Sequence, residues 1–241
     1  MRIVFDRNAK QEYSRPLCPG IPNQEAAVII GGSKALSLNE EGNALPAPAV
    51  RPEHVVALAA SAGGLAALSH VLSSLPADFA APLLVVQHLS PRHRSWLAEI
   101  LGRRTALAVT QVQGGERIAA GRVYVAPPDH HLLLQHDGVL GLSDLSRVQH
   151  VRPSADLLFT SLAEAWGPGA VAVVLSGTGR DGAAGVLAIK EHGGTVIAQD
   201  KASAEFFGMP DAAFRTGGVD RVLPLDGIAL ALVRLTEGER A

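Results

Sequence analysis

Short apolar runs alternate with amphipathic segments from His54 onward, and this alternation predicts the fold. Near-continuous apolarity in the runs indicates strands covered on both faces, which is typical of a parallel sheet. The alternation predicts one α/β domain with a doubly wound, mainly parallel sheet and helices on both faces. The strands are expected at 55–60, 82–88, 122–128, 170–177 and 194–200, and the helices at 64–74, 93–103, 155–166, 182–192 and 225–235.

The segment HLLLQHDGVLGLSD at 131–144 interrupts this alternation. It places Asp137-Gly138 between two apolar runs, and this dipeptide favours the tight turn of a β-hairpin. We expect an antiparallel hairpin at an edge of the parallel sheet.

The N-terminal part of the chain lacks a sustained hydrophobic period. Only AAVII at 26–30 could form a short strand, and the sequence LPAPAVRP precedes the change of pattern. We therefore expect an N-terminal extension or linker over 1–52 and a single domain over 53–238.

Composition narrows the class of protein. The chain has 21 Lys and Arg against 23 Asp and Glu, so overall charge indicates neither nucleic acid nor an anionic membrane as a partner. No apolar run reaches the roughly 18 residues that span a bilayer, and the N-terminus lacks the apolar core of a signal peptide. The one cysteine, Cys18, cannot form an intrachain disulfide, which suits a reducing compartment. We expect a cytoplasmic protein.

Ser61 follows the first predicted strand and precedes two glycines and a helix. A serine here can cap the helix through its side-chain oxygen. It can also belong to a dinucleotide loop, although the pattern is A-x-S-x-G-G rather than G-x-G-x-x-G. The third alternative is a nucleophile on a strand-to-helix turn with backbone N–H groups nearby for an oxyanion.

His88 and Asp181 follow two other predicted strands. A histidine at a strand end is often only structural, and an aspartate before a helix is often an N-cap. In open α/β sheets, however, ligands bind beyond the carboxyl ends of the strands. A serine, a histidine and an acid at such ends are the parts of a hydrolytic triad, whose chain order differs between folds. The three residues together favour a hydrolase active site.

Six ordered motifs resemble one family. They lie around Ser61 (ASAGG), at His88 (VVQHLSP) and around Asp181 (VVLSGTGRDGAAG), with GERIAAGRVYVAPPDHHL, VRPSADLLFTSLA and FGMPDAAF at 115–132, 151–163 and 207–214. In this order they are similar to the catalytic domain of CheB-type protein-glutamate methylesterases, over about residues 54–236. The resemblance identifies Ser61 as nucleophile, His88 as base and Asp181 as the acid.

The resemblance also implies a reaction. The substrate would be a γ-glutamyl methyl ester on a chemoreceptor's cytoplasmic helix, the products a carboxylate and methanol, and receptor glutamine deamidation a further activity. Backbone N–H groups near Ala62 and Thr178 would hold the oxyanion. No cofactor or metal is needed. A receiver domain, which related proteins often carry, typically needs about 100 residues or more, so we expect none within 1–52.

The sequence departs from the family pattern at several positions beside the site. Ala59 and Ala62 stand where the family usually has glycine and threonine, and Thr178 and Arg180 where it usually has methionine and asparagine. We expect Ala59 to be tolerated, whereas Ala62 and Arg180 can alter rate or substrate choice. Asp156, near another predicted helix start, has capping as its expected role.

Alternatives remain at the level of the sequence. The histidines in DHH at 129–131 lack a zinc-binding spacing, so we expect no metal. The segment 90–104 is either a solvated helix face or a contact for acidic receptor helices; its arginines are Arg92, Arg94, Arg103 and Arg104. A serine hydrolase acting on another ester or amide, and a non-catalytic binding module, are the rival functions.

Overall fold

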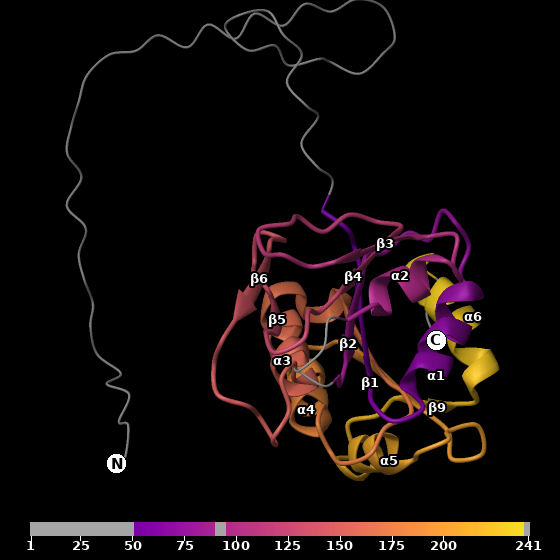
Figure 1. Ribbon diagram of the computed structural model, residues 1–241. Coiled ribbons are helices and arrows are strands. Elements are labelled where there is room, and N and C mark those ends of the chain that lie inside the picture. The colour runs from indigo at the N-terminus through magenta and orange to yellow at the C-terminus, as the bar shows by residue number, and fades with distance from the viewer. Residues whose placement is uncertain (1–50, 90–94, 239–241) are drawn as a thin grey trace, which may run out of the picture. The chain divides into compact units, whose positions relative to one another are not determined.

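The computed structural model describes residues 51–89 and 95–238. The possible strand at 26–30, most of the expected extension and the predicted start of a helix at 93 lie outside these residues. Within the described part, the predicted α/β architecture is confirmed (Figure 1).

A seven-stranded parallel sheet forms the centre of the domain, with strand order β3-β4-β2-β1-β7-β8-β9. All six residues of β1 are buried, as its uninterrupted apolar sequence predicts. The direction of winding changes beside β1, because the chain adds β2 on one side and later returns with β7 on the other. The strands are β1 (Val55–Ala60), β2 (Leu83–Gln87), β3 (Ala108–Gln111), β4 (Arg122–Val125), β7 (Ala170–Val174), β8 (Thr195–Gln199) and β9 (Arg221–Leu223).

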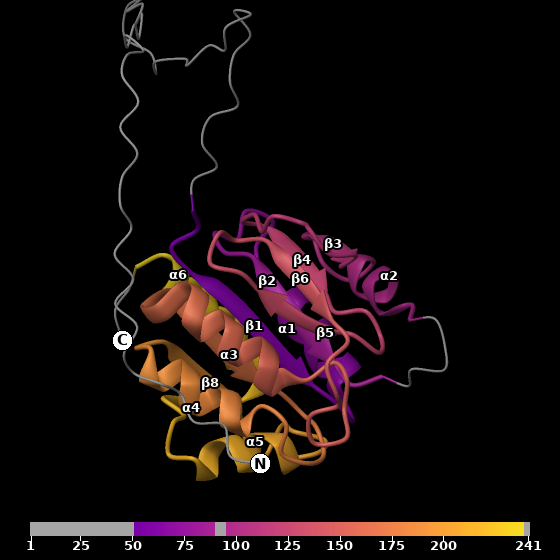
Figure 2. The ribbon, with the colours of Figure 1, turned by 90° about the vertical axis from the view of Figure 1, so that its left-hand side faces the viewer.

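Helices cover both faces of this sheet (Figure 2). Alternate residues of β1 belong to two separate cores: Ala57 packs with the side that carries α3 and α4, and Leu58 with the side that carries α1, α2 and α6. The helices are α1 (Gly64–Ser73), α2 (Leu97–Gly102), α3 (Ala155–Trp166), α4 (Ala183–Glu191), α5 (Gly208–Arg215) and α6 (Leu225–Thr236), and a short 3₁₀ helix, Gly167–Gly169, precedes β7.

The predicted hairpin is present as β5 (His131–Leu134) and β6 (Leu140–Ser143), which pair antiparallel. Its position differs from the expectation, because it forms a two-stranded sheet of its own rather than joining an edge of the main sheet. Leu132 and Leu140 are fully buried in the core that also contains α3. The hairpin therefore covers one face of the domain instead of extending the sheet.

Arg51 and Pro52 contact the C-terminal end of α3. The boundary predicted from the sequence places both residues in the N-terminal extension. The Arg51 guanidinium lies 4.0 Å from the centre of the Trp166 ring and donates a hydrogen bond of 2.6 Å to the Ala165 carbonyl. The Trp166 indole N–H donates to the Pro52 carbonyl at 2.9 Å. These contacts connect both residues to the folded domain.

Two truncated chains measure how much Arg51 and Pro52 contribute to the stability of the domain. A chain beginning at Arg51 should be more stable than one beginning at Glu53 by about 1–2 kcal/mol, since the second loses a cation–π contact and two hydrogen bonds. Urea unfolding of both proteins measures the difference, and Arg51→Ala in the longer chain should reproduce most of it. Equal free energies of unfolding would contradict this contribution.

Candidate active site

Ser61 and His88 lie side by side at the carboxyl edge of the sheet. Ala60 on β1 is in register with Gln87 on β2, and the His88 N–H donates to the Ala60 carbonyl at 3.1 Å. On the other side, the Ser61 N–H donates to the Ser176 carbonyl beyond β7 at 3.0 Å. Ser61 is thus held at the point where the winding reverses, the usual ligand site in such sheets.

Ser61 is not a helix cap. The N-cap of α1 is Gly63, whose φ of 71° is favourable only for glycine, and no side chain caps this helix. Instead, the Ser61 carbonyl accepts hydrogen bonds from the Gly64 N–H and the Gln87 amide. Within the described residues, the Ser61 hydroxyl forms no hydrogen bond, which leaves it available for chemistry.

His88 contacts Asp181 directly. The His88 Nε2 atom lies 2.7 Å from Asp181 Oδ2, and both side chains are largely buried. Because a carboxylate only accepts, Nε2 carries the proton in this pair and the neutral ring has its lone pair on Nδ1. The structure therefore brings together two of the three residues that the sequence singled out as a triad, with Ser61 on the adjoining strand end.

Asp181 is anchored by a helix other than the one it precedes. The N-cap of α4 is Gly182, so the sequence alternative of Asp181 as its cap is wrong. Its carboxylate instead meets the N-terminus of α3: the Ser154 hydroxyl donates to Oδ1 at 2.7 Å, and the Ala155 N–H to Oδ2 at 2.6 Å. The Asp156 N–H adds a bond of 3.2 Å to Oδ1.

This anchoring sets the ionisation of Asp181. Burial acts to raise its pKa, but the hydrogen bonds from His88, Ala155 and Ser154 outweigh burial, and the pKa is lower than usual. The positive end of the α3 dipole favours the same charged form. Asp181 is therefore a fixed anion beside the His88 ring.

Asp156 is buried close to Asp181 but does not contact His88. It occupies the second position of α3, and its carboxylate accepts hydrogen bonds from the Gly185 N–H at 2.9 Å and the Gln149 amide at 2.8 Å. Burial, together with the nearby Asp181 charge, raises its pKa. The expected capping role is wrong, because this carboxylate connects α3 to α4 and to the loop before α3.

His131 also contacts the N-terminus of α3. Its Nδ1 accepts a hydrogen bond from the Ser154 N–H at 3.1 Å, and Nε2 lies 3.3 Å from the Ser146 carbonyl. The ring is fully buried, and burial lowers its pKa below the ordinary value of 6.5. Protonation of Nδ1 would place its N–H against the Ser154 N–H, and the hydrogen bond between them would be lost.

Stability should consequently depend on His131 in mild acid. A histidine whose pKa is lowered on folding binds fewer protons folded than unfolded, so its contribution is complete above pH 6.5 and is lost as the pH falls. The loss is at most about 1.4 kcal/mol per pH unit. Urea unfolding at about pH 7.5 and about pH 5.5 measures this slope.

His131→Asn, whose Oδ1 can still accept from the Ser154 N–H, should flatten the slope even though it lowers stability at both pH values. The same substitution at the exposed His192, His192→Asn, provides the matched comparison. An unchanged slope in His131→Asn would contradict the assignment.

Two backbone N–H groups belong to the loops that meet at Ser61. Those of Ala62 and Thr178 are not used in any hydrogen bond formed within the described chain. The Thr178 loop packs closely on Ser61: a Cβ at Gly177 would lie 3.0 Å from the Ser61 Cβ and would overlap the Met209 sulfur. Glycine at this position therefore allows the loop to approach.

A buried serine that sequence reasoning missed joins these loops. The Ser176 hydroxyl donates to the Ala62 carbonyl at 2.9 Å and accepts from the Phe206 N–H at 3.0 Å. Its own N–H donates to the buried Gln199 amide. No residue spacing in the sequence indicated this link, since the partners come from two separate loops and from the end of β8.

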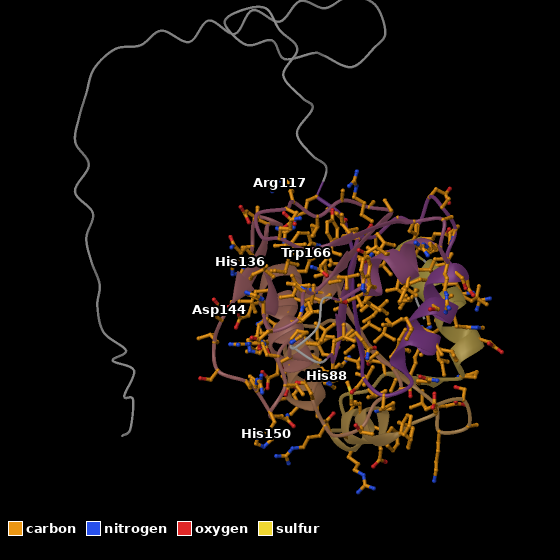
Figure 3. The ribbon with its side chains drawn as sticks, viewed as in Figure 1. His88, Arg117, His136, Asp144, His150 and Trp166 are labelled. Carbon is orange, nitrogen blue, oxygen red and sulfur yellow. The ribbon has the colours of Figure 1, made fainter. Side chains whose placement is uncertain are left out.

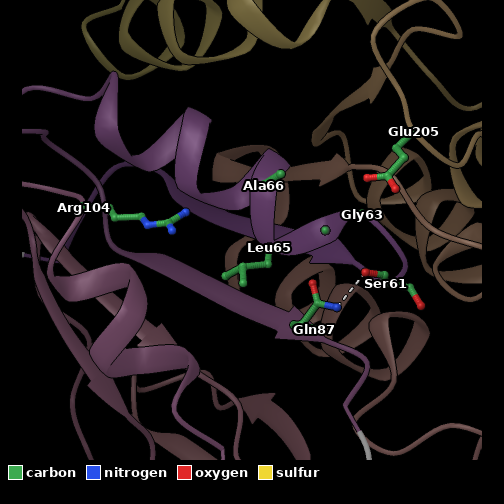
Figure 4. A pocket seen from close by; sticks show the side chains of 8 residues that line it. Ser61, Gly63, Leu65, Ala66, Gln87, Arg104 and Glu205 are labelled. Atoms are coloured by element: carbon green, nitrogen blue, oxygen red, sulfur yellow. Dashed lines mark hydrogen bonds between the residues drawn. The ribbon is translucent and has the colours of Figure 1, made fainter.

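An open pocket of about 360 Å³ adjoins Ser61 over the first turn of α1 (Figure 4). Leu65 and Ala66 form an apolar side, and Arg104 and Glu205 lie at opposite sides. Gln87, also missed from the sequence, lines the pocket and donates to the Ser61 carbonyl at 2.7 Å. Of the arginine-rich segment 90–104, the residues up to Arg94 lie outside the described part, and Arg104 faces this pocket.

Residues 51–89 and 95–238 contain no group of three or more His, Cys, Asp and Glu side chains arranged to hold a metal ion. None of the helices in these ranges is both long and apolar enough to cross a membrane.

Comparison with known proteins finds relatives of this chain. The sequence model described as CheB methylesterase matches residues 56–232. A protein-glutamate methylesterase/protein-glutamine glutaminase 2 of Anaeromyxobacter dehalogenans is 47% identical over 86% of this chain and 62% of its own length. The protein-glutamate methylesterase FrzG of Myxococcus xanthus is 43% identical over 76% of this chain and 55% of its own length.

A solved structure agrees with these relatives. The catalytic domain of a Thermotoga maritima CheB methylesterase is 37% identical, with a TM-score of 0.73 over 76% of this chain and 98% of that domain. The chain spans about three fifths or less of the two curated relatives.

Proposed function

Because the chain belongs to the CheB methylesterase family, we propose that it hydrolyses γ-glutamyl methyl esters on the cytoplasmic helices of chemoreceptors. The observation that carries this proposal is the 2.7 Å contact between His88 and Asp181 beside Ser61. It supplies an oriented base next to a free hydroxyl, as acyl transfer through a serine requires.

In the proposed first half-reaction, the Ser61 oxygen attacks the ester carbonyl while His88 Nδ1 takes the hydroxyl proton. Such hydrogen bonds are often long before substrate is bound. The buried Asp181 anion offsets the charge of the imidazolium that forms. The Ala62 and Thr178 N–H groups support the oxyanion, each contributing about 3 kcal/mol in comparable sites.

The first half-reaction ends when His88 returns its proton to the departing methoxide, which is too basic to leave unaided, and the acyl-enzyme remains. Water then attacks the acyl-enzyme, with Nδ1 again taking a proton, and a glutamate carboxylate and free Ser61 result. The same steps applied to a glutamine side chain release ammonia. Deamidation is therefore included in the proposal, and the names of several relatives support it.

The experiment is methanol release from a methylated chemoreceptor fragment. Release that depends on Ser61 supports the proposal. Hydrolysis of small acyl esters without methanol release would indicate a serine hydrolase for another substrate. Absence of both, together with no labelling of Ser61 by a fluorophosphonate, would indicate a non-catalytic binding module.

A further inference from the structure

A second pocket lies on the other side of the catalytic histidine. It measures about 90 Å³ and is lined by His88, Leu89, Arg147, His150, Val151 and Arg152. Figure 3 shows His150 beyond His88 at the same end of the domain. Any molecule in this pocket would lie directly beside the reacting groups.

Arginine side chains gather at this pocket and in the loop beside it. Arg147 and Arg152 share one acid, Asp129, at 3.6 and 2.9 Å. Arg180 is exposed, and its Nε donates to the neutral Gln149 amide at 3.1 Å. In the part of the chain that the structure describes, no acid lies within ion-pair distance of Arg180. Among the described residues, the carboxylate of Asp129 is thus the one that pairs with any of these three arginines.

The loop that carries these residues is held in an unusual backbone conformation. The non-glycine residues with positive φ in the described chain are Asp129, Gln149 and His150, at 59°, 49° and 70°. Two of them lie in this loop, and the third is bonded to it through Arg152. Such conformations cost free energy and concentrate at binding and catalytic sites.

Arg152 fixes the loop rather than meeting a partner. Its guanidinium donates to the Asp144 and Leu145 carbonyls as well as to Asp129, and its side chain is only 19% exposed. The Arg147 side chain, by contrast, is 53% exposed. The loop is therefore a preorganised platform whose exposed groups are available to a ligand.

From these observations we propose that Arg147 and Arg180 form a docking surface for an acidic stretch of the protein substrate, next to the glutamyl residue that reacts. This inference rests on the proposed function. Leu145, which is 61% exposed beside Arg147, offers apolar contact to the same segment. Nucleic acid fits less well, because no Phe, Tyr or Trp side chain lines the pocket to stack on a base.

Three synthetic peptides of equal length test the surface. Each carries one γ-glutamyl methyl ester, flanked by glutamates, glutamines or lysines. Binding is measured by fluorescence anisotropy on the Ser61→Ala protein, and methanol release on the wild type. We expect the glutamate-flanked peptide to bind about fivefold to twentyfold more tightly than the glutamine-flanked one, a preference that high salt should reduce.

A second experiment reverses the charge of the proposed docking surface. Arg147→Glu with Arg180→Glu should reverse the preference toward the lysine-flanked peptide, and tight binding of that peptide would also show that the variant is folded. Arg122→Glu is the matched control, because Arg122 is an exposed arginine at the start of β4, and the site lies beyond the carboxyl ends of the parallel strands. It should keep the preference for the glutamate-flanked peptide.

The outcomes separate the two proposals. Equal binding of the glutamate- and glutamine-flanked peptides, or an unaltered preference after charge reversal, would overturn the docking surface. Failure of the wild type to release methanol from all three peptides would contradict the proposed function, while the binding preference would still decide the docking surface.

Discussion

Replacing Ser61 with alanine is expected to reduce methanol release by about five to six powers of ten, because the substitution removes the atom that attacks the ester in the proposed mechanism. The fold should be unaffected. Within residues 51–89 and 95–238 the Ser61 hydroxyl makes no hydrogen bond, and the local structure depends on its N–H and carbonyl groups, which alanine retains.

Ser74→Ala is the matched control for this variant. Ser74 lies at the other end of α1, where its hydroxyl donates to the His70 carbonyl at 2.9 Å. The same chemical change there should leave turnover within about twofold, since an exposed hydroxyl of this kind affects stability only slightly. Methanol release by well-folded Ser61→Ala at the control rate would remove Ser61 as the nucleophile.

The central strands and most helices could be predicted from the sequence, because burial on both faces leaves an unbroken apolar run such as 55–60. The edge strands β3 and β9 and the helix α5 could not. Each edge strand meets a partner on one side only, and β3 alternates exposed with half-buried residues, so its sequence AVTQ carries little apolar signal. Short, partly exposed strands resemble loops in sequence.

The residues of the candidate site could be predicted from the sequence, but the contacts that hold Asp181 in place could not. Strand ends placed Ser61, His88 and Asp181 at one edge of the sheet, because parallel strands share a direction. The partners of Asp181 come from α3, which precedes it in the chain by about twenty-five residues. Because Asp181 directly precedes α4, its place in the sequence suggests that it caps this helix. Only the tertiary structure shows that its carboxylate contacts the N-terminus of α3 instead.

Asp181→Asn is expected to lower turnover by about two to four powers of ten. The carboxylate accepts four hydrogen bonds, from His88, Ser154 and two backbone N–H groups, and an amide has one oxygen to offer. If its nitrogen takes the place of Oδ2, it faces His88 and favours the tautomer that lacks a base at Nδ1. If it takes the place of Oδ1, His88 keeps its tautomer but loses the anion that offsets the imidazolium.

Asp156→Asn is the controlled comparison, because Asp156 is a second buried aspartate at the same helix start and does not contact His88. Its amide oxygen can still accept from the Gly185 N–H, and the Gln149 amide can accept from the new nitrogen by turning, which gives up its bond with Arg180. We expect a loss of about 1 kcal/mol in stability and less than about tenfold in turnover. The measurement is the turnover number for methanol release, taken well below the melting temperature of each variant. Equal losses in the two variants, or a larger loss at Asp156, would contradict the role proposed for Asp181, because burial and a helix N-terminus are common to both residues and only the contact with His88 distinguishes them.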